Sequence, residues 1–183
     1  MSVTGLLLAA GAGTRMGTPK ALVDDWLRRS VGVLLDGGCD GVVVVLGAGA
    51  PEATPLVDGL AVDVVVADDW ADGMAASLRA GLRSLDPTAT AAVVHLVDLP
   101  DVTAPVVARL LARTRGAHSL ARATYAGRPG HPVLLGRDHW EPVVATARGD
   151  HGARDYLAAH EVEAVECGDL ATGHDQDLPR DGG

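Results

Sequence analysis

Short apolar runs alternate with amphipathic stretches along most of this chain. The apolar run at 3–9 lacks polar alternation and predicts a buried strand. Strand-like runs lie at 3–9, 41–46, 62–66, 91–97, 119–125, 131–135 and 161–166. Between them, apolar positions at helical spacing predict helices at about 24–36, 74–85, 103–115 and 151–160. The alternation predicts one α/β domain over residues 1–183, with a mostly parallel, Rossmann-like sheet flanked by helices.

Composition agrees with this fold class and excludes several others. The chain has 183 residues, of which 48% are hydrophobic but only 3% aromatic, so Val, Leu and Ala must form the core. The two cysteines are too few for a disulfide framework. The polar, Asp- and Gly-rich stretch from Gly168 onward predicts a partly mobile tail.

Charge and hydropathy limit the classes of partner that the protein can bind. A net charge of −9 argues against a nucleic-acid partner, which would require a basic face. It leaves a small nucleotide open, because local positive charge can lie within an acidic surface. No signal peptide stands at the start and no apolar run reaches spanning length. We therefore expect a cytoplasmic protein with no membrane partner.

The first predicted strand leads into a loop suited to a polyphosphate. Gly11, Gly13 and Gly17 allow positive φ and let backbone N–H groups approach a ligand. Arg15 and Lys20 add permanent positive charge beside those donors. The glycine spacing alone would also suit a dinucleotide fold. The second strand, however, runs into Gly47-Ala48-Gly49 without the carboxylate that usually binds the ribose.

The full string is more specific than its glycines. Leu8-Ala9-Ala10-Gly11-x-Gly13-x-Arg15-Met16-Gly17-x-Pro19-Lys20 resembles the signature loop of nucleotidyltransferases with a GT-A-like fold. It most resembles that of the MocA-like molybdenum cofactor cytidylyltransferases. The resemblance implies that the loop wraps a nucleoside triphosphate, with Arg15 and Lys20 on its phosphates. The nucleotide-binding residues carried over are Leu8, Ala9, Ala10, Gly11, Gly13, Arg15, Gly17 and Lys20.

A carboxylate follows the fourth predicted strand. Asp98 begins an Asp-Leu-Pro turn, at the strand end where open α/β sheets bind their ligands. A carboxylate there suits Mg²⁺, which prefers oxygen ligands and is usually shared with substrate phosphates. The turn also matches the family's metal-binding aspartate. Asp98 is therefore our main candidate metal ligand and, with Arg15 and Lys20, a candidate catalytic residue.

Three further segments match the family. Gly73-Met74-x-x-Ser77-Leu78 resembles a family segment near the nucleotide, and the resemblance implies that Ser77 contacts it. His131 opens Gly-His-Pro-Val-Leu, which in the family lies at the mouth of the acceptor pocket; the alternative is a structural histidine. Gly152 and Arg154 belong to Gly-Asp-His-Gly-Ala-Arg, where a helix start and a guanidinium could bind an acceptor phosphate.

The closing stretch His174-Asp175-Gln176-Asp177-Leu178-Pro179-Arg180-Asp181 resembles a family segment that returns to the metal. It departs from the family at Leu178, which replaces a threonine. The resemblance implies that Asp175 or Asp177 is a second metal ligand; alone, an acidic tail is usually solvated. A second departure follows Lys20. The family's short polar connection with a glycine pair is missing, through either a deletion or a loop absent from this sequence.

The matched segments imply transfer of CMP from CTP to molybdenum cofactor (molybdopterin), with release of pyrophosphate and with Mg²⁺ or Mn²⁺ as cofactor. A molybdoenzyme would then receive the product. The methyl group of Ala10 favours CTP, since guanylyl-transferring relatives typically have glycine there, although this is weak discrimination. A guanylyltransferase with the same or another phosphorylated acceptor therefore stays open.

Two alternatives come from other classes. An NAD(P)H-dependent oxidoreductase would explain the glycine loop but not the retained Lys20 and Asp98. A non-catalytic pterin-binding delivery protein would explain the fold and the altered closing stretch, but not the retained charges.

Overall fold

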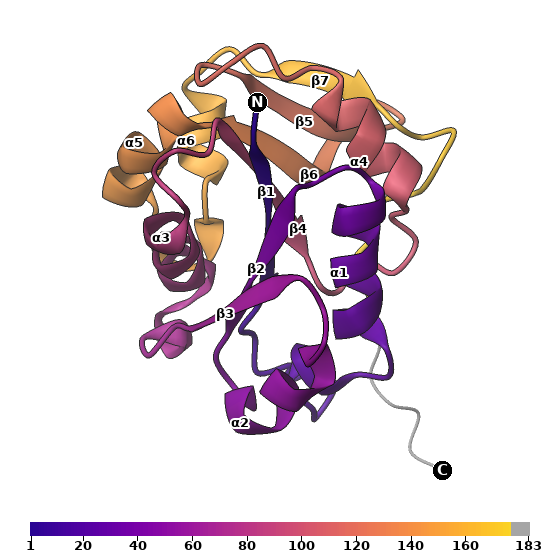
Figure 1. The fold of residues 1–183 in the computed structure, drawn as a ribbon, viewed down its shortest axis with the longest axis vertical. Helices are drawn as coiled ribbons and strands as arrows, with labels where there is room; N and C mark the ends of the chain where they lie inside the picture. Colours follow the sequence, from indigo (N-terminus) through magenta and orange to yellow (C-terminus); the bar gives the residue numbers. More distant parts are fainter. Residues whose placement is uncertain (177–183) are drawn as a thin grey trace.

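The computed structural model describes residues 1–176, and its seven strands form one sheet (Figure 1). Their order across the sheet is β3-β2-β1-β4-β6-β5-β7. The strands are β1 (Val3–Ala9), β2 (Gly41–Leu46), β3 (Val62–Val66), β4 (Ala91–Leu96), β5 (Leu120–Tyr125), β6 (Arg128–Gly136) and β7 (Glu163–Glu166).

Six strands run in the same direction, and β6 runs against them. Strands β1 to β4 pair in parallel, β6 is antiparallel to both β4 and β5, and β7 is parallel to β5. A two-residue turn of Ala126 (φ 50°) and Gly127 (φ 76°) joins β5 to β6. Two positive φ angles match the twist of a tight hairpin. The predicted mostly parallel α/β class is confirmed.

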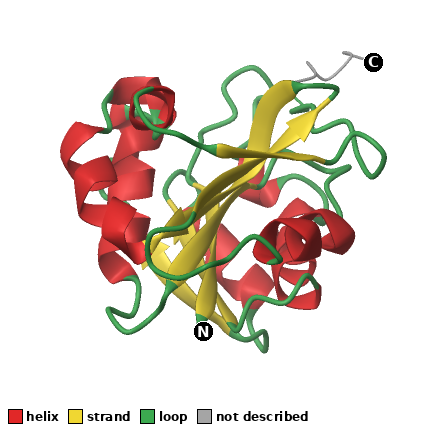
Figure 2. Cartoon of the chain, turned by 90° about the horizontal axis from the view of Figure 1, so that it is seen from above, coloured by secondary structure: helices red, strands yellow, loops and turns green. Residues whose placement is uncertain are grey.

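Helices cover both faces of the sheet (Figure 2). One face carries α1 (Trp26–Asp36) and α4 (Ala104–Leu111), and the other carries α3 (Met74–Ser84), α5 (Trp140–Thr146) and α6 (Arg154–Ala158). The short α2 (Ala50–Ala53) follows β2. None of the helices described combines the length and apolar character needed to cross a membrane.

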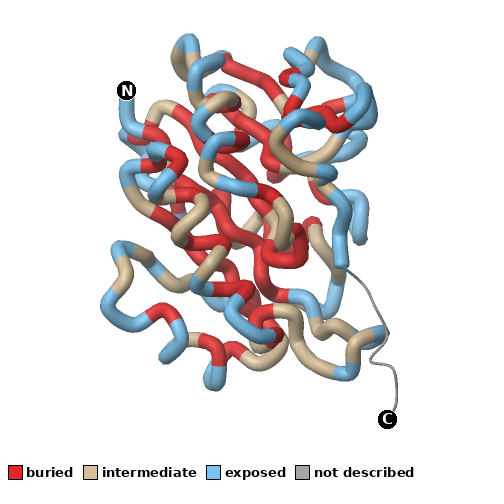
Figure 3. Tube along the Cα trace, turned by 90° about the vertical axis from the view of Figure 1, so that its right-hand side faces the viewer, coloured by how far each residue is buried: buried red, intermediate tan, exposed pale blue. Residues whose placement is uncertain are grey.

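The two faces explain the absence of polar alternation in the central strands. In β1, Leu7 packs into the cluster under α1 and α4, whereas Leu6 and Leu8 pack into the cluster under α3, α5 and α6. Val44 and Val45 of β2 divide in the same way. Figure 3 shows these buried strands between exposed segments. Strands covered on both faces read as continuous apolar runs.

The helix predictions need correction in length and number. The prediction for 103–115 ends at Leu111, and that for 151–160 shrinks to one short turn, α6. Helix α5 was missed because its seven residues, with Pro142 near the start, are too short for a clear period. After Lys20, a 3₁₀ turn (Lys20–Leu22) leads to α1 within four residues.

The stretch after Gly168 departs from the expectation of a tail. Leu170 and Ala171 pack against the core. Thr172 donates its backbone N–H and its hydroxyl to Asp101 Oδ2 at 2.6 and 2.5 Å. Residues 168–176 are therefore attached to the domain, and the remainder of the predicted tail, 177–183, lies outside the described residues.

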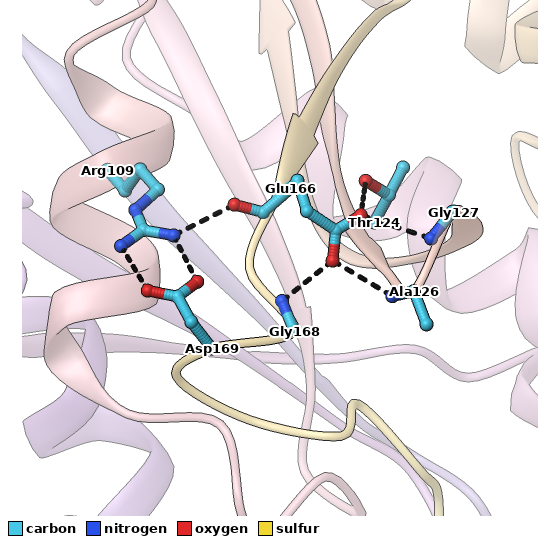
Figure 4. Close-up of polar contacts among 7 residues, drawn as sticks. All are labelled: Arg109, Thr124, Ala126, Gly127, Glu166, Gly168 and Asp169. Carbon is cyan, nitrogen blue, oxygen red and sulfur yellow. Dashed lines mark hydrogen bonds and ion pairs between the residues drawn. The ribbon is translucent and has the colours of Figure 1, made fainter.

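One carboxylate joins the hairpin to the end of β7 (Figure 4). Glu166 accepts backbone N–H groups of Gly127, Gly168 and Ala126 at 3.1, 2.9 and 2.8 Å, and the Thr124 hydroxyl at 2.9 Å. The hydrogen bond from Gly127 is the largest of the causes that lower the Glu166 pKa to about 2.

A neighbouring arginine ties α4 to the same strand end (Figure 4). The Arg109 guanidinium makes two hydrogen bonds to Asp169, at 2.6 and 2.9 Å, and one to the Glu166 carbonyl at 2.8 Å. The paired geometry is the strong form of this contact. Together with Glu166, it fixes the edge strand β7 to both the hairpin and the helix layer.

Glu166 should make stability depend on acid pH. Its pKa is lower in the folded state than the ordinary 4.5, so its contribution is present above about pH 4.5 and is lost as pH falls toward 2. We expect Glu166→Gln to lower the free energy of unfolding at pH 7. Between pH 5 and 2, the free energy of unfolding of the variant should fall less steeply than that of the wild type. Urea unfolding across this range measures both effects. Exposed Glu161, changed to Gln, is the control; equal pH slopes for wild type and Glu166→Gln would contradict the assignment.

Candidate active site

The candidate site lies where the direction of strand connection changes. β1 is flanked by β2 on one side and β4 on the other, and Leu8 of β1 is opposite Leu96 of β4. The Val97 N–H donates to the Leu8 carbonyl at 3.2 Å, which keeps the two chains together as they leave the sheet. In open α/β sheets, ligands bind in the crevice at such a point.

The glycine loop after β1 folds back on itself. The N–H groups of Met16 and Gly17 donate to the Gly13 carbonyl at 2.8 and 2.9 Å, and that of Lys20 donates to Gly11 at 3.1 Å. Gly13 has φ 59°, and a Cβ there would lie 1.9 Å from the Thr18 carbonyl oxygen. The loop therefore requires glycine at this position both for its φ angle and for the close backbone contact.

This fold of the loop brings Lys20 to Asp98. Lys20 Nζ lies 2.5 Å from Asp98 Oδ2, with 21% and 11% of the two side chains exposed. Asp98 follows β4, so the pair joins the two halves of the crevice. Opposite charges this sheltered from water interact more strongly than a surface pair. The arrangement places one cation and one anion where a metal-bound polyphosphate would need both.

A cavity of about 430 Å³ opens over the loop, and we call it the loop cavity. It is lined by seven consecutive residues, Leu8 to Thr14, with Lys20 and Asp98. Ser77 of α3 belongs to its wall, as do Trp70, Met74 and Asp150. The described geometry thus gathers most of the predicted nucleotide-binding residues around one space. Arg15 lines the neighbouring cavity instead, and Gly17 lines neither.

A second space of about 1100 Å³, the wide cavity, continues from the first. The two share Lys20, Asp98 and Asp150. The wide cavity adds the candidate acceptor residues His131 and Arg154 together with Arg15, Arg122, Asp175 and a set of apolar side chains. Gly152 does not line it; the glycine lies beside Met74, whose Sδ atom would be 3.2 Å from an added Cβ.

His131 is an uncharged member of the wide cavity. Burial, followed by the charge of Arg122, lowers its pKa to about 4. At neutral pH the imidazole is therefore neutral and can either donate or accept a hydrogen bond. The Tyr125 hydroxyl donates to the His131 carbonyl at 2.6 Å and holds this part of β6.

Asp98 and Asp175 are two carboxylates of the described chain that could bind a metal ion together. Asp98 and Asp175 both line the wide cavity, and the Gln176 N–H donates to the Asp98 carbonyl at 3.0 Å. Asp177 lies outside the described residues. Within residues 1–176, no group of three or more potential ligands converges on one point. Two carboxylates nevertheless fit Mg²⁺, which commonly takes one or two from the protein and completes its shell with water and substrate phosphates.

Several residues in the walls of the two cavities were not candidates from the sequence, among them Trp70, Met74, Asp150 and Arg122. Asp150 stood inside the Gly-Asp-His-Gly-Ala-Arg segment, and Met74 inside the serine segment, so both motifs carried a usable signal. Arg122 did not, because its position follows from pairing opposite Val133 on a neighbouring strand. Trp70 begins a short 3₁₀ turn (Trp70–Asp72), and it packs beside Gly47, where an added Cβ would lie 2.6 Å from the Trp70 side chain.

Comparisons with known proteins agree with this architecture. The family described as "MobA-like NTP transferase domain" matches residues 5–165. The chain is 36% identical to the nicotine blue oxidoreductase of Paenarthrobacter nicotinovorans over an alignment of 189 residues. This alignment covers 96% of this chain and 92% of that protein. The same part of the chain therefore matches both a transferase family and a protein that is named an oxidoreductase.

Solved structures show the same likeness. A Mycobacterium sp. strain JC1 homologue of the M. tuberculosis protein Rv0371c has a TM-score of 0.81 and 33% identity, covering 96% of this chain and 90% of that one. Rv0371c from M. tuberculosis H37Rv, solved as a complex with manganese, has a TM-score of 0.71 and 27% identity, covering 91% and 89%.

The geometry of the loop can be tested by comparing alanine substitutions at Gly13 and Gly17. Gly13→Ala brings a methyl group against the Thr18 carbonyl, whereas Gly17→Ala, at φ 70°, meets no atom within 4 Å. We expect Gly13→Ala to increase amide hydrogen exchange at Met16, Gly17 and Lys20. Gly17→Ala should show only the strain of a left-handed backbone, about 1–2 kcal/mol. Unchanged protection of the loop amides in Gly13→Ala would contradict the geometry.

Proposed function

The chain belongs to the MobA-like NTP transferase domain family, and we propose on this premise that it transfers a nucleoside monophosphate from a nucleoside triphosphate to a phosphorylated acceptor. The observation that carries the proposal is the Lys20–Asp98 pair beside the glycine loop. A triphosphate needs both donors for its oxygens and a carboxylate for its divalent cation. The pair and the loop amides supply these groups at the edge of one cavity.

The roles of the residues follow from their positions. Loop amides and Lys20 would hold the β- and γ-phosphates, with Arg15 facing the acceptor side. Asp98, with Asp175, would hold Mg²⁺ or Mn²⁺, which when bound neutralises phosphate charge. An acceptor phosphate oxygen then attacks the α-phosphorus in line; the new P–O bond forms as the α–β bond breaks and pyrophosphate leaves. The attacking oxygen is already ionised, so no protein base is needed.

CTP and molybdopterin are the finer form of this proposal. Ala10 lines the loop cavity, and its methyl group narrows the space beside the loop. The wide cavity would take the pterin-type acceptor against His131 and Arg154, and a molybdoenzyme would receive the product. GTP as donor leaves the chemistry unchanged and alters only the fit at Ala10.

Oxidoreductase chemistry is the second candidate, and one observation favours it. The relative with 36% identity is named nicotine blue oxidoreductase, and the alignment covers 92% of that protein. An NAD(P)H molecule could use the same glycine loop for its pyrophosphate. Against this, β2 ends at Leu46 before Gly47-Ala48-Gly49, without a carboxylate for a ribose, and a nicotinamide cofactor gives no reason for Lys20–Asp98.

Calorimetric titration with CTP, GTP, ATP and NADPH, each with and without Mg²⁺, tests the proposal. We expect CTP to bind most tightly and Mg²⁺ to strengthen its binding. Tighter GTP binding would keep the transferase and replace the donor. NADPH binding without triphosphate binding would favour the oxidoreductase. Binding of none of the four would favour the non-catalytic delivery protein.

Asp98→Asn should separate metal binding from folding. The amide keeps the size of the side chain but removes the charge that a hard cation requires. We expect Mg²⁺ no longer to strengthen CTP binding, and pyrophosphate release with molybdopterin to fall by about 100-fold or more. Asp36→Asn, at the exposed end of α1, is the control. Near-normal turnover in Asp98→Asn would remove Asp98 from the mechanism.

A further inference from the structure

Two arginines that line the wide cavity have no carboxylate partner among residues 1–176. Arg122 stands in the middle of β5, and Arg154 is the first residue of α6. Among residues 1–176, the ion pairs within 4.0 Å include neither of them. Arg122 donates from Nη2 to the Gly130 carbonyl at a long 3.3 Å, and its buried Nε has no hydrogen-bond partner in the described chain.

The charges of these two side chains act on each other. Burial, and then the positive charge of Arg154, lower the pKa of Arg122. The charge of Arg122 in turn adds to burial in keeping His131 neutral. The protein thus holds two cations within electrostatic range of each other, beside an uncharged imidazole. Arg122 is the partly buried one of the two, and a sheltered charge without a partner is costly; an anion bound between the two guanidinium groups would offset that cost.

The sheet supplies an apolar surface beside these charges. Val94 of β4 is opposite Val133 of β6, and Val133 is opposite Arg122 of β5. Residues directly opposite each other share one face of a sheet, so the guanidinium stands beside Val94 and Val133 on the same side. Leu96 lies two residues beyond Val94, on that face, and all four residues line the wide cavity.

We propose that Arg122 and Arg154 bind the phosphate of a phosphomonoester whose ring-bearing body lies on Val94, Leu96 and Val133. Two guanidinium groups match a phosphate dianion better than a singly charged carboxylate, because each can donate paired N–H groups. The inference rests on the proposed function in one respect: the phosphomonoester would be the acceptor. It adds Arg122 as a substrate-binding residue and assigns the acceptor an apolar ring next to its phosphate.

Phenyl phosphate is a suitable probe, since it carries a phosphate dianion directly on an apolar ring. It is titrated into the protein without nucleotide or metal, and binding is followed by ³¹P NMR. We expect Arg122→Gln to weaken binding by about 10-fold or more. Arg128→Gln should leave it unchanged, because exposed Arg128 begins β6 on the same hairpin but lines neither cavity. Inorganic phosphate should bind more weakly than phenyl phosphate.

Arg154→Gln provides a second variant at an exposed position, in case Arg122→Gln fails to fold as judged by circular dichroism. It should also weaken phenyl phosphate binding. Binding that survives in both variants would place the phosphate on the glycine loop and overturn the inference, as would failure of the wild type to bind. The calorimetric nucleotide titrations test the proposed function separately. A wild-type protein that binds phenyl phosphate through Arg122 but does not bind CTP would overturn only the proposed function.

Discussion

The structure depends on the complete burial of β1. This strand lies between β2 and β4 in the sheet and between two helical layers, with Leu6 and Leu7 fully buried. Because both faces are covered, the strand fixes the positions of α1 and α3 relative to each other. It also fixes where the glycine loop begins. The loop then turns sharply at Gly13, whose positive φ is one that glycine adopts readily.

Much of the fold and part of the candidate site could be predicted from the sequence. The central strands β1, β2 and β4 carried the clearest signal, as nearly continuous apolar runs, because burial on both faces leaves little room for polar residues. Asp98 was found because it follows such a run directly. The glycine loop was found because glycine, arginine and lysine lie close together in the sequence. In these cases the chemistry is local, and one short segment contains it.

Other parts could not be predicted because their information lies in pairing between distant segments. Arg122 reaches the wide cavity through its register with Val133 and, through that residue, with Val94. For the closing stretch, the family resemblance implied a return to the site, but the sequence did not show its contacts, which join Thr172 to Asp101 and Gln176 to the Asp98 carbonyl. The short helix α5 lacked a clear helical period, and α6 is shorter than its predicted range. Each of these depends on contacts across many residues, and a single sequence records none of them.

The reversed direction of β6 has an evolutionary consequence. The parallel strands β1 and β4 reach the crevice at their ends, but β6 meets the same edge of the sheet at its beginning, just after the Ala126-Gly127 turn. The hairpin can therefore vary without displacing the strand that leads into the glycine loop. Insertions or substitutions within it would reshape the wall around His131 while the glycine loop, on the far side of β4, keeps its position. Such changes would alter which molecules the wide cavity accepts and leave the loop cavity as it is.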